Sequence, residues 1–453
     1  MKVVVVGAGM SGAAAAALLY NREDLVYLMD TKEAAELPFV RDLILPEEQR
    51  VFGREMTLAN VPGGAPDLMV LSPGVPPKAK VVQEALTEGI PIWSEVELAL
   101  TGDSEGDLGA VVVGVTGSNG KTTTTSLIGV LAGSTGKRSV VAGNIGLPLA
   151  GLSPVEYDYV VAELSSFQLA FLDRLRIPIA VLLNVTPDHL DWHGSFEEYA
   201  EAKGRIFRNQ LPGDLCVINW DCPVCRRLSE QAQSRRVFFS STVLLDTGWG
   251  LEKGWIVRRC DGRSQPVVAV DELQLKGAHN YENVMAALAV GEELRLSDAD
   301  LAGIVSGFAP VRHRQEVVGT FDGVLFVNDS KATNPDSAIK ALASYAQPIV
   351  LLAGGKNKGL DMTQFMEAAR GCCRCVVFYG EAADELRSAA AAVGIPRMMS
   401  VGSFAEAVKA AIAVAEAGDV VLLSPGCTSW DAFKNYEERG ACFRELVREH
   451  FSG

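Results

Sequence analysis

The sequence of 453 residues has no excess of basic residues. Its 41 lysines and arginines stand against 56 aspartates and glutamates, which gives a formal net charge of −15. A chain this acidic has no general electrostatic attraction to nucleic acid or to an anionic membrane. We therefore expect no nucleic-acid partner, and any binding of phosphate must depend on a few local groups.

The sequence also lacks the cysteine spacing of a zinc finger or a disulfide framework. Its nine cysteines are an odd number, in a chain too long to need disulfide staples. Cys222 and Cys225 form a CxxC pair, and Cys373 and Cys375 a CxC pair, but no second Cys or His pair follows at zinc-site spacing. Zinc binding stays an alternative, and reduced thiols in a cytoplasmic protein are the simpler interpretation.

No stretch is long and apolar enough to span a membrane. The uncharged segment Val3–Tyr20 follows Lys2, as in a signal peptide, but Gly7, Gly9 and Gly12 interrupt it. A buried strand, a tight turn and a helix explain this segment better.

The residues that are present predict an α/β protein. At about 150 residues per domain the length suggests about three domains, and 48% hydrophobic with 21% charged residues argues against disorder. Short runs that are apolar on both faces alternate with helical patterns, as in parallel sheets covered by helices. The predicted strands are Val3–Val6, Leu25–Met29, Leu68–Leu71, Val111–Val115, Val160–Ala162, Ala180–Leu183, Val324–Val327, Ile349–Leu352, Val376–Tyr379 and Val420–Leu423.

Two changes of pattern suggest domain limits. Thr101–Gly109 is polar and glycine-rich, which predicts a linker, and a second change lies near Gly307–Pro310. We expect domains at residues 1–100, 101–309 and 310–453. Between about Cys216 and Leu275 the pattern is less regular, and we expect antiparallel strands there.

The first glycine motif is Gly7–Gly12 after a buried strand, with Asp30 at the end of the next strand. Such glycines let the backbone approach phosphate, and the acid can bond a ribose hydroxyl. A related loop, Ser72–Gly74, follows another strand. A nucleotide-type ligand is favoured, and a glycine turn that only packs a helix on a strand is the alternative. Taken alone, the motif would also allow a nicotinamide-dependent dehydrogenase.

The second glycine motif is more specific. A buried strand leads into Gly117-Ser118-Asn119-Gly120, and Lys121 and Thr122 open a helix. Backbone N–H groups of such a loop bind phosphates, Lys121 would neutralise their charge and the Thr122 hydroxyl would reach Mg²⁺. Gly114 lies seven residues before Lys121, one more than in the usual P-loop.

This spacing, G-x-T-G-x-N-G-K-T, resembles the Mur ligases, which are ATP-dependent amino-acid ligases of peptidoglycan synthesis, and their relative folylpolyglutamate synthase. The resemblance covers almost the whole chain: GNIG at Gly143–Gly146, ELSSFQ at Glu163–Gln168, N-x-x-x-DHLD at Asn184–Asp191, G-x-HN-x-x-N at Gly277–Asn283, HR-x-E at His313–Glu316 and NDSKATN at Asn328–Asn334. The last motif, with SWDAFK at Ser429–Lys434, is most similar to the D-glutamate-adding member.

Three residues of the central third suit metal chemistry. Glu163 ends a buried strand, where a carboxylate can meet a metal on bound phosphate, although a surface glutamate is the alternative. His189 lies in a Pro-Asp-His turn and is either a ligand or a satisfied turn histidine. Lys203 falls in the middle of an apolar helix face between Tyr199 and Phe207, where burial would depress its pKa, unless it reaches solvent from the edge.

The resemblance implies a role for individual residues. ATP would be bound by Gly117, Ser118, Asn119, Gly120, Lys121, Thr122, Thr123, Asn283, Arg314 and Asp329. The UDP substrate would meet Met10, Ser11, Asp30, Thr31, Lys32, Ser72, Pro73, Gly74 and Asn144. The acceptor amino acid would meet Lys331, Thr333, Lys358 (or Lys356), Ser429, Trp430 and Tyr436. Catalysis would depend on Lys121, His189, Lys203 and Arg314.

The resemblance also implies the architecture and the reaction. It implies a Rossmann-like first domain, a central P-loop ATPase-like domain and a Rossmann-like third domain, in a monomer that closes about a hinge near Gly307–Val311. Two Mg²⁺ ions would be held by Thr122 with Glu163, and by His189 with a carbamate on Lys203. The reaction would join D-glutamate to UDP-N-acetylmuramoyl-L-alanine through an acyl phosphate. A ligase with another acceptor amino acid and a non-catalytic nucleotide-binding protein are the alternatives.

Overall fold

The computed structural model describes residues 1–101, 109–153, 156–309 and 311–452. The chain forms two compact units, Met1–Glu272 with Glu282–Ser306, and Leu273–Tyr281 with Gly307–Gly453. Most of the predicted linker (residues 102–108) and Pro310 of the predicted hinge lie outside the described residues.

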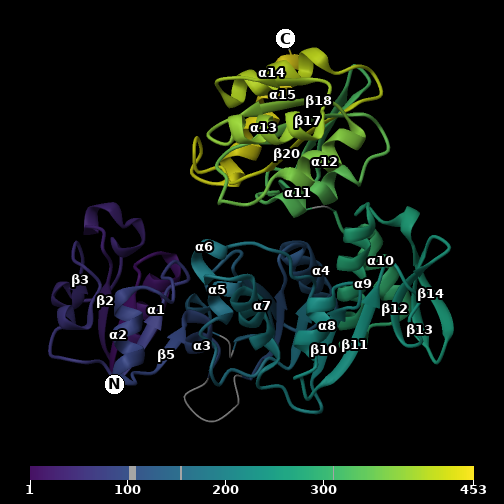
Figure 1. Cartoon of the computed structure of the whole chain (residues 1–453). Coiled ribbons are helices and arrows are strands. Elements are labelled where there is room, and N and C mark those ends of the chain that lie inside the picture. The colour runs from purple at the N-terminus through teal and green to yellow at the C-terminus, as the bar shows by residue number, and fades with distance from the viewer. Residues whose placement is uncertain (102–108, 154–155, 310, 453) are drawn as a thin grey trace. The chain divides into compact units, whose positions relative to one another are not determined.

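The first unit opens with a parallel sheet of five strands (Figure 1). The order is β3 (Arg50–Val51), β2 (Leu25–Met29), β1 (Lys2–Val6), β4 (Leu68–Leu71) and β5 (Ile92–Ser94), the order of a dinucleotide-binding half-sheet. Val3 and Val5 pack into one apolar cluster and Val4 and Val6 into another, because successive side chains of a strand point to opposite faces. Helices α1 (Met10–Asn21) and α3 (Glu95–Leu100) contribute to the first cluster and α2 (Lys80–Glu88) to the second.

The second sheet of this unit has nine strands. The order is β14 (Arg263–Ala269), β13 (Trp255–Cys260), β12 (Gly248–Glu252), β11 (Arg235–Ser240), β10 (Leu215–Asn219), β9 (Ile179–Leu182), β6 (Val111–Thr116), β8 (Tyr159–Glu163) and β7 (Ser139–Gly143). Its helices are α4 (Lys121–Ser134), α5 (Ser166–Leu169), α6 (Leu190–His193), α7 (Phe196–Gly204) and α8 (Pro223–Ser229). Helices α9 (Ala278–Glu293) and α10 (Asp298–Gly307) also belong to this unit, except for Ala278–Tyr281 and Gly307.

The change to antiparallel strands comes later than predicted. β10, β11 and β12 still pair in parallel, and only β12–β13 and β13–β14 are antiparallel. The prediction of an antiparallel sheet from about Cys216 was therefore wrong for β10 and β11. No separate signal marks the parallel pairing of β10, because β10 is fully buried like the parallel strands before it.

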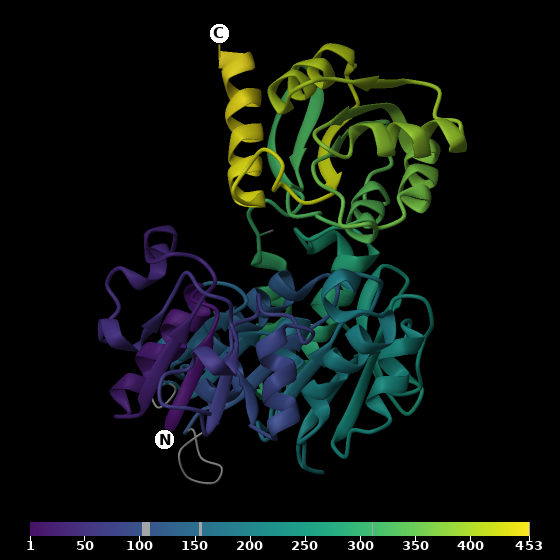
Figure 2. The same ribbon diagram turned by 60° about the vertical axis from the view of Figure 1, so that its left-hand side comes forward.

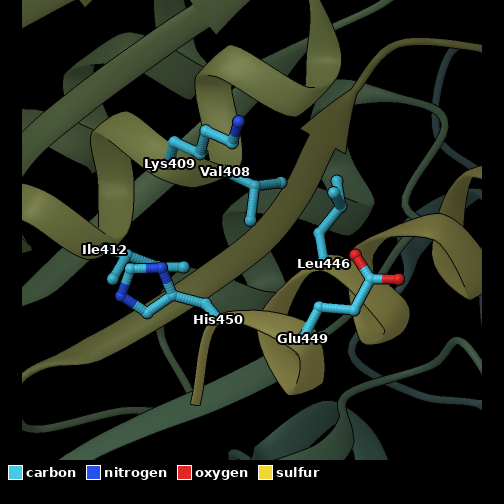
Figure 3. A pocket seen from close by; sticks show the side chains of 6 residues that line it. All are labelled: Val408, Lys409, Ile412, Leu446, Glu449 and His450. Atoms are coloured by element: carbon cyan, nitrogen blue, oxygen red, sulfur yellow. The ribbon is translucent and has the colours of Figure 1, made fainter. Parts of the chain in front are cut away.

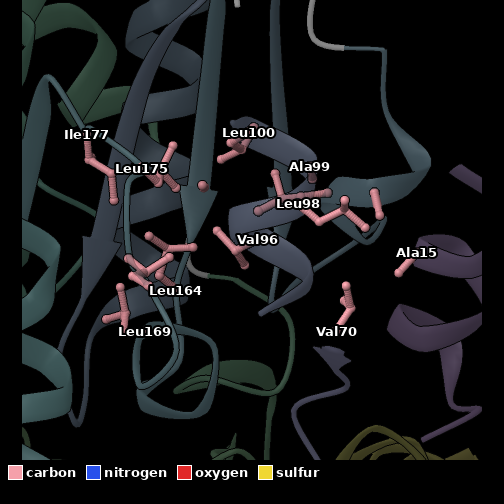
Figure 4. Close-up of a cluster of buried hydrophobic side chains, with 14 of the residues drawn as sticks. Ala15, Val70, Val96, Leu98, Ala99, Leu100, Leu164, Leu169, Leu175 and Ile177 are labelled. Carbon is pink, nitrogen blue, oxygen red and sulfur yellow. The ribbon is translucent and has the colours of Figure 1, made fainter. Parts of the chain in front are cut away.

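One apolar core runs through both sheets of the first unit. Helix α3 lies between them, and Figure 4 shows its Val96 and Leu98 between Val70 of β4 and Leu164 beyond β8. Apolar burial of this kind contributes about 25 cal/mol per Å², so α3 fastens the first sheet to the second.

The second unit contains a sheet of six strands. The order is β15 (Glu316–Phe321), β16 (Val324–Asn328), β20 (Val420–Gly426), β17 (Ile349–Gly354), β18 (Cys373–Tyr379) and β19 (Met398–Ser400). All neighbours are parallel except β15 and β16. Helices α11 (Pro335–Leu342), α12 (Thr363–Cys372) and α13 (Ala383–Val393) pack on one face. Helices α14 (Phe404–Val414) and α15 (Tyr436–Ser452, yellow in Figure 2) pack on the other.

All ten predicted strands are confirmed, with ends within three residues of those observed. The strands without a prediction include short edge strands such as β3, β5 and β19. Two or three residues carry too little periodicity to identify a strand from sequence.

Candidate active site

The loop between β6 and α4 has the geometry of a phosphate-binding loop. Gly120 has φ of 85°, a left-handed conformation that favours glycine. The Lys121 ammonium group folds back and donates to the carbonyl oxygens of Gly117 (2.8 Å) and Ser118 (2.9 Å). The lysine thus lies against the loop whose bound phosphates it was predicted to neutralise.

The segment after β9 supports this loop. The Asn184 side-chain oxygen accepts the N–H of Asn119 at 2.8 Å, and the Asn184 carbonyl accepts the N–H of Ser118 at 2.9 Å. The Ser118 hydroxyl donates to the carbonyl oxygen of Thr186 and lies 2.7 Å from the Tyr199 hydroxyl. Sequence analysis gave Asn184 no role, although its place after a strand in a motif was a signal.

Asn283 lies against the same loop. A Cβ atom on Gly120 would fall 2.2 Å from the Asn283 side-chain oxygen, so only glycine leaves room for this contact. The structure therefore brings Asn283 to the loop, as expected of a residue near the nucleotide.

Lys203 is fully buried, with 1% of its surface exposed. Its ammonium group donates to the carbonyl oxygen of Gly117 at 2.9 Å and lies 4.7 Å from the centre of the Tyr199 ring. Burial, followed by the positive charge of Lys121, lowers the pKa of Lys203 well below its usual value. The alternative of a lysine reaching solvent is therefore wrong. Helix α7 is capped at its start, because the Ser195 hydroxyl accepts the N–H of Glu198.

Glu163, at the end of β8, is 1% exposed, which excludes the surface alternative. One carboxylate oxygen accepts the side-chain N–H of Asn144 at 2.8 Å. The other oxygen is buried and has no hydrogen-bond partner among the described residues. Asn144, predicted to meet the UDP substrate, is therefore also a partner of the predicted metal ligand.

His189 belongs to an aromatic cluster beside Lys203. Its backbone has φ of 54°, its ring lies edge-on to Phe167 at 4.7 Å, and its Nε2 is 3.6 Å from an Asp188 oxygen. The neighbouring His193 bonds the Ser166 hydroxyl at 2.9 Å, and burial, helped by the charge of Lys203, lowers the pKa of His193 to about 4.

The central residues fit a divalent cation. The partnerless oxygen of Glu163 and the free-energy cost of leaving a buried carboxylate uncompensated both favour a cation there. No three His, Cys, Asp or Glu side chains within the described ranges group closely enough to hold a metal without further ligands. Oxygen ligands from a hydroxyl and from bound phosphate would suit a Mg²⁺ ion at Glu163.

The first glycine loop is hydrogen-bonded to Asp30, the acid that follows β2. The Asp30 carboxylate accepts the N–H of Ala8 at 2.7 Å and that of Lys32 at 2.9 Å. A Cβ atom on Gly12 would lie 1.8 Å from the Gly7 carbonyl oxygen, so glycine permits close packing of helix on strand. Ser72 lies against this loop, since its Cβ would be 2.8 Å from a Cβ atom on Gly7. The other predicted UDP contacts begin α1 (Met10, Ser11), follow β2 (Thr31, Lys32) or follow β4 (Pro73, Gly74).

In the second unit, Asp329 follows β16 and is 5% exposed. Its carboxylate accepts the Ser424 hydroxyl at 2.9 Å and the Gln315 N–H at 3.2 Å. Burial raises the pKa of Asp329 to about 7, and the positive charge of Arg314 opposes the shift. The predicted ATP residues Arg314 and Asp329 are therefore electrostatic neighbours.

The predicted acceptor residues lie on loops after strands of this sheet and at the start of α15. The Lys331 ammonium group lies 5.1 Å from the centre of the Tyr436 ring, Ser429 is 2% exposed and Trp430 is 67% exposed. The Lys356 ammonium group pairs with Glu381 at 3.3 Å. Thr333 and Lys358 are in the loops after β16 and β17.

Arg439 is a residue that sequence analysis missed. It is 0% exposed and donates to the Ser330 hydroxyl and carbonyl and to the carbonyls of Cys427 and Thr428, at 2.8–3.2 Å. It thus fixes the loops after β16 and β20. Arg439 ends the charged segment Tyr436–Arg439, so nothing in the sequence indicated that its side chain would be buried.

A hollow of about 230 Å³ between α14 and α15 contains none of the predicted site residues (Figure 3). It is lined by Val408, Lys409, Ile412, Leu446, Glu449 and His450. In the described ranges, no helix combines the length and apolar character needed to cross a bilayer.

Comparison with known proteins identifies the class. Residues 1–94 match the family model of the MurD-like N-terminal domain of Mur ligases, residues 115–291 the Mur ligase middle domain, and residues 313–427 the Mur ligase glutamate ligase domain. The chain belongs to the Mur ligase family. The dehydrogenase interpretation of the first glycine loop is not supported, since that segment matches a ligase domain.

Two curated relatives are named UDP-N-acetylmuramoylalanine–D-glutamate ligase. The relative from Desulfitobacterium hafniense (strain Y51) is 50% identical, covering 99% of this chain and 98% of its own. That from Pelotomaculum thermopropionicum is 44% identical, covering 98% and 97%.

Solved structures share the fold. UDP-N-acetylmuramate–alanine ligase MurC from Thermotoga maritima has a TM-score of 0.62 at 20% identity, covering 99% of this chain and 100% of its own. MurF ligase from Thermotoga maritima in complex with ADP has a TM-score of 0.57 at 19% identity, covering 86% and 91%.

Proposed function

We propose that this protein uses ATP to join D-glutamate to UDP-N-acetylmuramoyl-L-alanine in a cytoplasmic step of peptidoglycan synthesis. The observation that carries the proposal is the 50% identity, along the whole chain, with a ligase named for this reaction. The match of residues 313–427 to the glutamate ligase domain supports the acceptor class.

The alanyl carboxylate is a poor electrophile, and transfer of the γ-phosphoryl group of ATP converts it to an acyl phosphate. The carboxylate oxygen attacks phosphorus and ADP leaves; the amine of D-glutamate then attacks the acyl carbon, and phosphate leaves with formation of the amide. The protein's contribution is mainly positioning and charge neutralisation.

The phosphate loop and Lys121 suit the ATP phosphates. Two neighbours of the loop support this assignment: Asn184 holds its backbone, and Asn283 lies over Gly120, where adenine is expected. In the second unit, Arg314 and Asp329 are assigned to the γ-phosphate and the ribose. His189, beside Asp188, is assigned to the catalytic group with Lys121, Lys203 and Arg314.

Mg²⁺ would neutralise phosphate charge when bound. Thr122 and Glu163 are assigned to one ion, because the partnerless Glu163 oxygen needs a cation. His189 and Lys203 are assigned to a second ion. A buried lysine with a depressed pKa is neutral enough to react with CO₂, and the carbamate would replace a cation by an anionic oxygen ligand.

D-glutamate brings two carboxylates, and we assign them to Lys331, Thr333, Lys358 and Ser429, with Trp430 and Tyr436 beside them. Lys356, which pairs with Glu381, stays the alternative to Lys358. The UDP moiety is assigned to the loops around Asp30 and Ser72. We keep the domain limits 1–100, 101–309 and 310–453, a monomer and closure near Gly307–Val311 as part of this proposal.

The test is ATP-dependent phosphate release with UDP-N-acetylmuramoyl-L-alanine and a panel of amino acids. Release is expected with D-glutamate, and the ligated product should appear by mass spectrometry. Release with L-glutamate or a diamino acid, but not with D-glutamate, would assign a different acceptor. Binding of ATP without release for any amino acid would favour a non-catalytic nucleotide-binding protein.

A further inference from the structure

The CxxC pair has no part in the proposed ligation. Cys222 directly precedes helix α8, and Cys225 lies in its first turn. Cys225 is fully buried, whereas Cys222 is partly exposed. Side chains three residues apart on a helix are neighbours, with Cβ atoms about 5–6 Å apart, so a small movement brings the two sulfurs to bonding distance.

The two thiols differ in the way an attacking and a resolving cysteine differ. The Cys225 thiol donates a hydrogen bond to Cys222, and N–H groups of Cys225, Val185 and Val224 also favour its thiolate, so the pKa of Cys222 is lowered to about 6. Burial raises the pKa of Cys225 well above its usual value. Because the thiolate is the nucleophile, Cys222 is the one that reacts with an oxidant.

The pair is connected to the phosphate loop through Val185. Val185 is 4% exposed and gives its N–H to Cys222. Its neighbours in sequence, Asn184 and Thr186, make the hydrogen bonds that hold Asn119 and Ser118. Val185 therefore links the Cys222 sulfur to Asn184 and Thr186, the two residues that support the phosphate loop.

We propose that Cys222 and Cys225 form a redox-active dithiol that reacts with peroxide, and that the resulting disulfide weakens ATP binding at the phosphate loop. The Cys222 thiolate attacks a peroxide oxygen, the O–O bond breaks, and a sulfenic acid and hydroxide form. The Cys225 thiol then attacks the Cys222 sulfur and water leaves. In total, the two thiols lose two electrons and two protons, and hydrogen peroxide becomes two waters.

The disulfide takes away the anionic acceptor of the Val185 N–H. A buried N–H group without an acceptor is unfavourable, so residues 184–186 would shift to give the Val185 N–H another acceptor. The hydrogen bonds of this segment to Ser118 and Asn119 would then be lost. Loss of one such interaction corresponds to about a tenfold fall in ATP affinity.

The reduced full-length protein is treated with hydrogen peroxide, remaining thiols are alkylated, and disulfides are mapped by mass spectrometry. Binding of a non-hydrolysable ATP analogue is measured by calorimetry before oxidation, after it, and after dithiothreitol. We expect a Cys222–Cys225 disulfide, a Kd for the analogue raised about tenfold, and full reversal by dithiothreitol. The C225A variant keeps the Cys222 acceptor, so it should bind the analogue when reduced and form no disulfide with peroxide, whereas C260S, at an exposed cysteine, should respond like the unchanged protein.

A disulfide between Cys372 and Cys373 instead, or none, would overturn the assignment of the dithiol. A Cys222–Cys225 disulfide with unchanged analogue affinity would overturn the effect on ATP. That effect rests on the proposed function, while the thiol mapping does not. If the reduced protein binds no analogue, the proposed function and the effect on ATP binding are both contradicted. Disulfide mapping would still show whether Cys222 and Cys225 form a redox-active pair.

Discussion

The ammonium nitrogen of Lys203 lies 2.9 Å from the carbonyl oxygen of Gly117, which also accepts the ammonium group of Lys121 at 2.8 Å. Two lysines therefore share one oxygen, and one of them is fully buried. Burial and repulsion from the charge of Lys121 together lower the pKa of Lys203. Its amine is thereby prepared to react rather than to form an ion pair.

The first prediction is that Lys203 carries a carbamate when the ligands are present. The neutral amine attacks CO₂ and loses a proton, so isotopically labelled bicarbonate should give a carbamate resonance by NMR in protein with ADP and Mg²⁺. The resonance should be absent in Lys203→Arg and present in Lys253→Arg, at an exposed lysine. A structure with two bound Mg²⁺ ions beside an unmodified Lys203 would contradict the prediction.

The second prediction concerns Lys203→Met and pH. The lowered pKa means that Lys203 binds its proton less well in the folded protein than in the unfolded chain. Lys203 therefore costs no stability above pH 10.5, and stability is lost as pH falls from there toward the pKa of Lys203 in the folded state. Lys203→Met should raise the free energy of unfolding at neutral pH by about 1–3 kcal/mol and lower kcat more than about a hundredfold. Urea unfolding at several pH values is the measurement, and a gain that does not shrink toward pH 10.5 would count against it.

The third prediction compares two buried carboxylates of α3. Glu95 accepts the N–H of Ala150 at 2.6 Å, but its second oxygen has no hydrogen bond in the described parts of the chain, and burial raises its pKa to about 7. Its contribution to stability is complete below pH 4.5 and is lost as pH rises through about 7. Glu95→Gln should therefore stabilise the protein by at most about 2–3 kcal/mol above neutral pH, and should have little effect at low pH.

The matched control for Glu95→Gln is Glu97→Gln, on the same helix. Glu97 accepts the N–H groups of Asp173, Arg174 and Leu175, at 2.7–3.3 Å. Hydrogen bonds to a charged acceptor contribute about 1.5–3 kcal/mol, so Glu97→Gln should destabilise. Thermal unfolding of both variants gives the comparison, and shifts of the same sign at neutral pH would refute it.

The fourth prediction is that Arg439 positions the acceptor site without touching ATP. Arg439→Lys cannot serve four acceptors on two loops, so we expect KM for D-glutamate to rise about tenfold or more and stability to fall by about 2–4 kcal/mol. Binding of ATP should change little. Arg448→Lys, at an exposed position of the same helix, is the control, and equal losses in the two variants would exclude a positioning role.

The fifth prediction is closure of the two units on ligand binding. The proposed function assigns both Lys121 of the first unit and Arg314 of the second to the ATP phosphates, and closure would exclude water from the acyl phosphate. Small-angle scattering should show a smaller radius of gyration with UDP-N-acetylmuramoyl-L-alanine and an ATP analogue than without them. An unchanged radius would count against the closure and against a hinge near Gly307–Val311.

Local motifs predicted the fold class and much of the candidate site, because their residues follow buried strands. The phosphate loop and Glu163 were found in this way, and Lys203 was found from its place on an apolar helix face. Residues that act through backbone contacts between distant segments were missed. Asn184 meets the loop across 65 residues, and Arg439 reaches Ser330 across 109. No spacing in one sequence encodes such pairs, because the fold alone brings them together.

The buried carboxylates of α3 have a consequence for how this family can diversify. Glu95 accepts the N–H of Ala150 and Glu97 that of Leu175, so helix α3, which directly follows the segment matching the MurD-like N-terminal domain, is fitted to two loops beside the second sheet. A first domain transplanted from a relative would lose that fit unless both loops came with it. The boundary for a working chimera therefore lies beyond Leu175, well inside the central sheet, rather than at the glycine-rich segment where the sequence changes character.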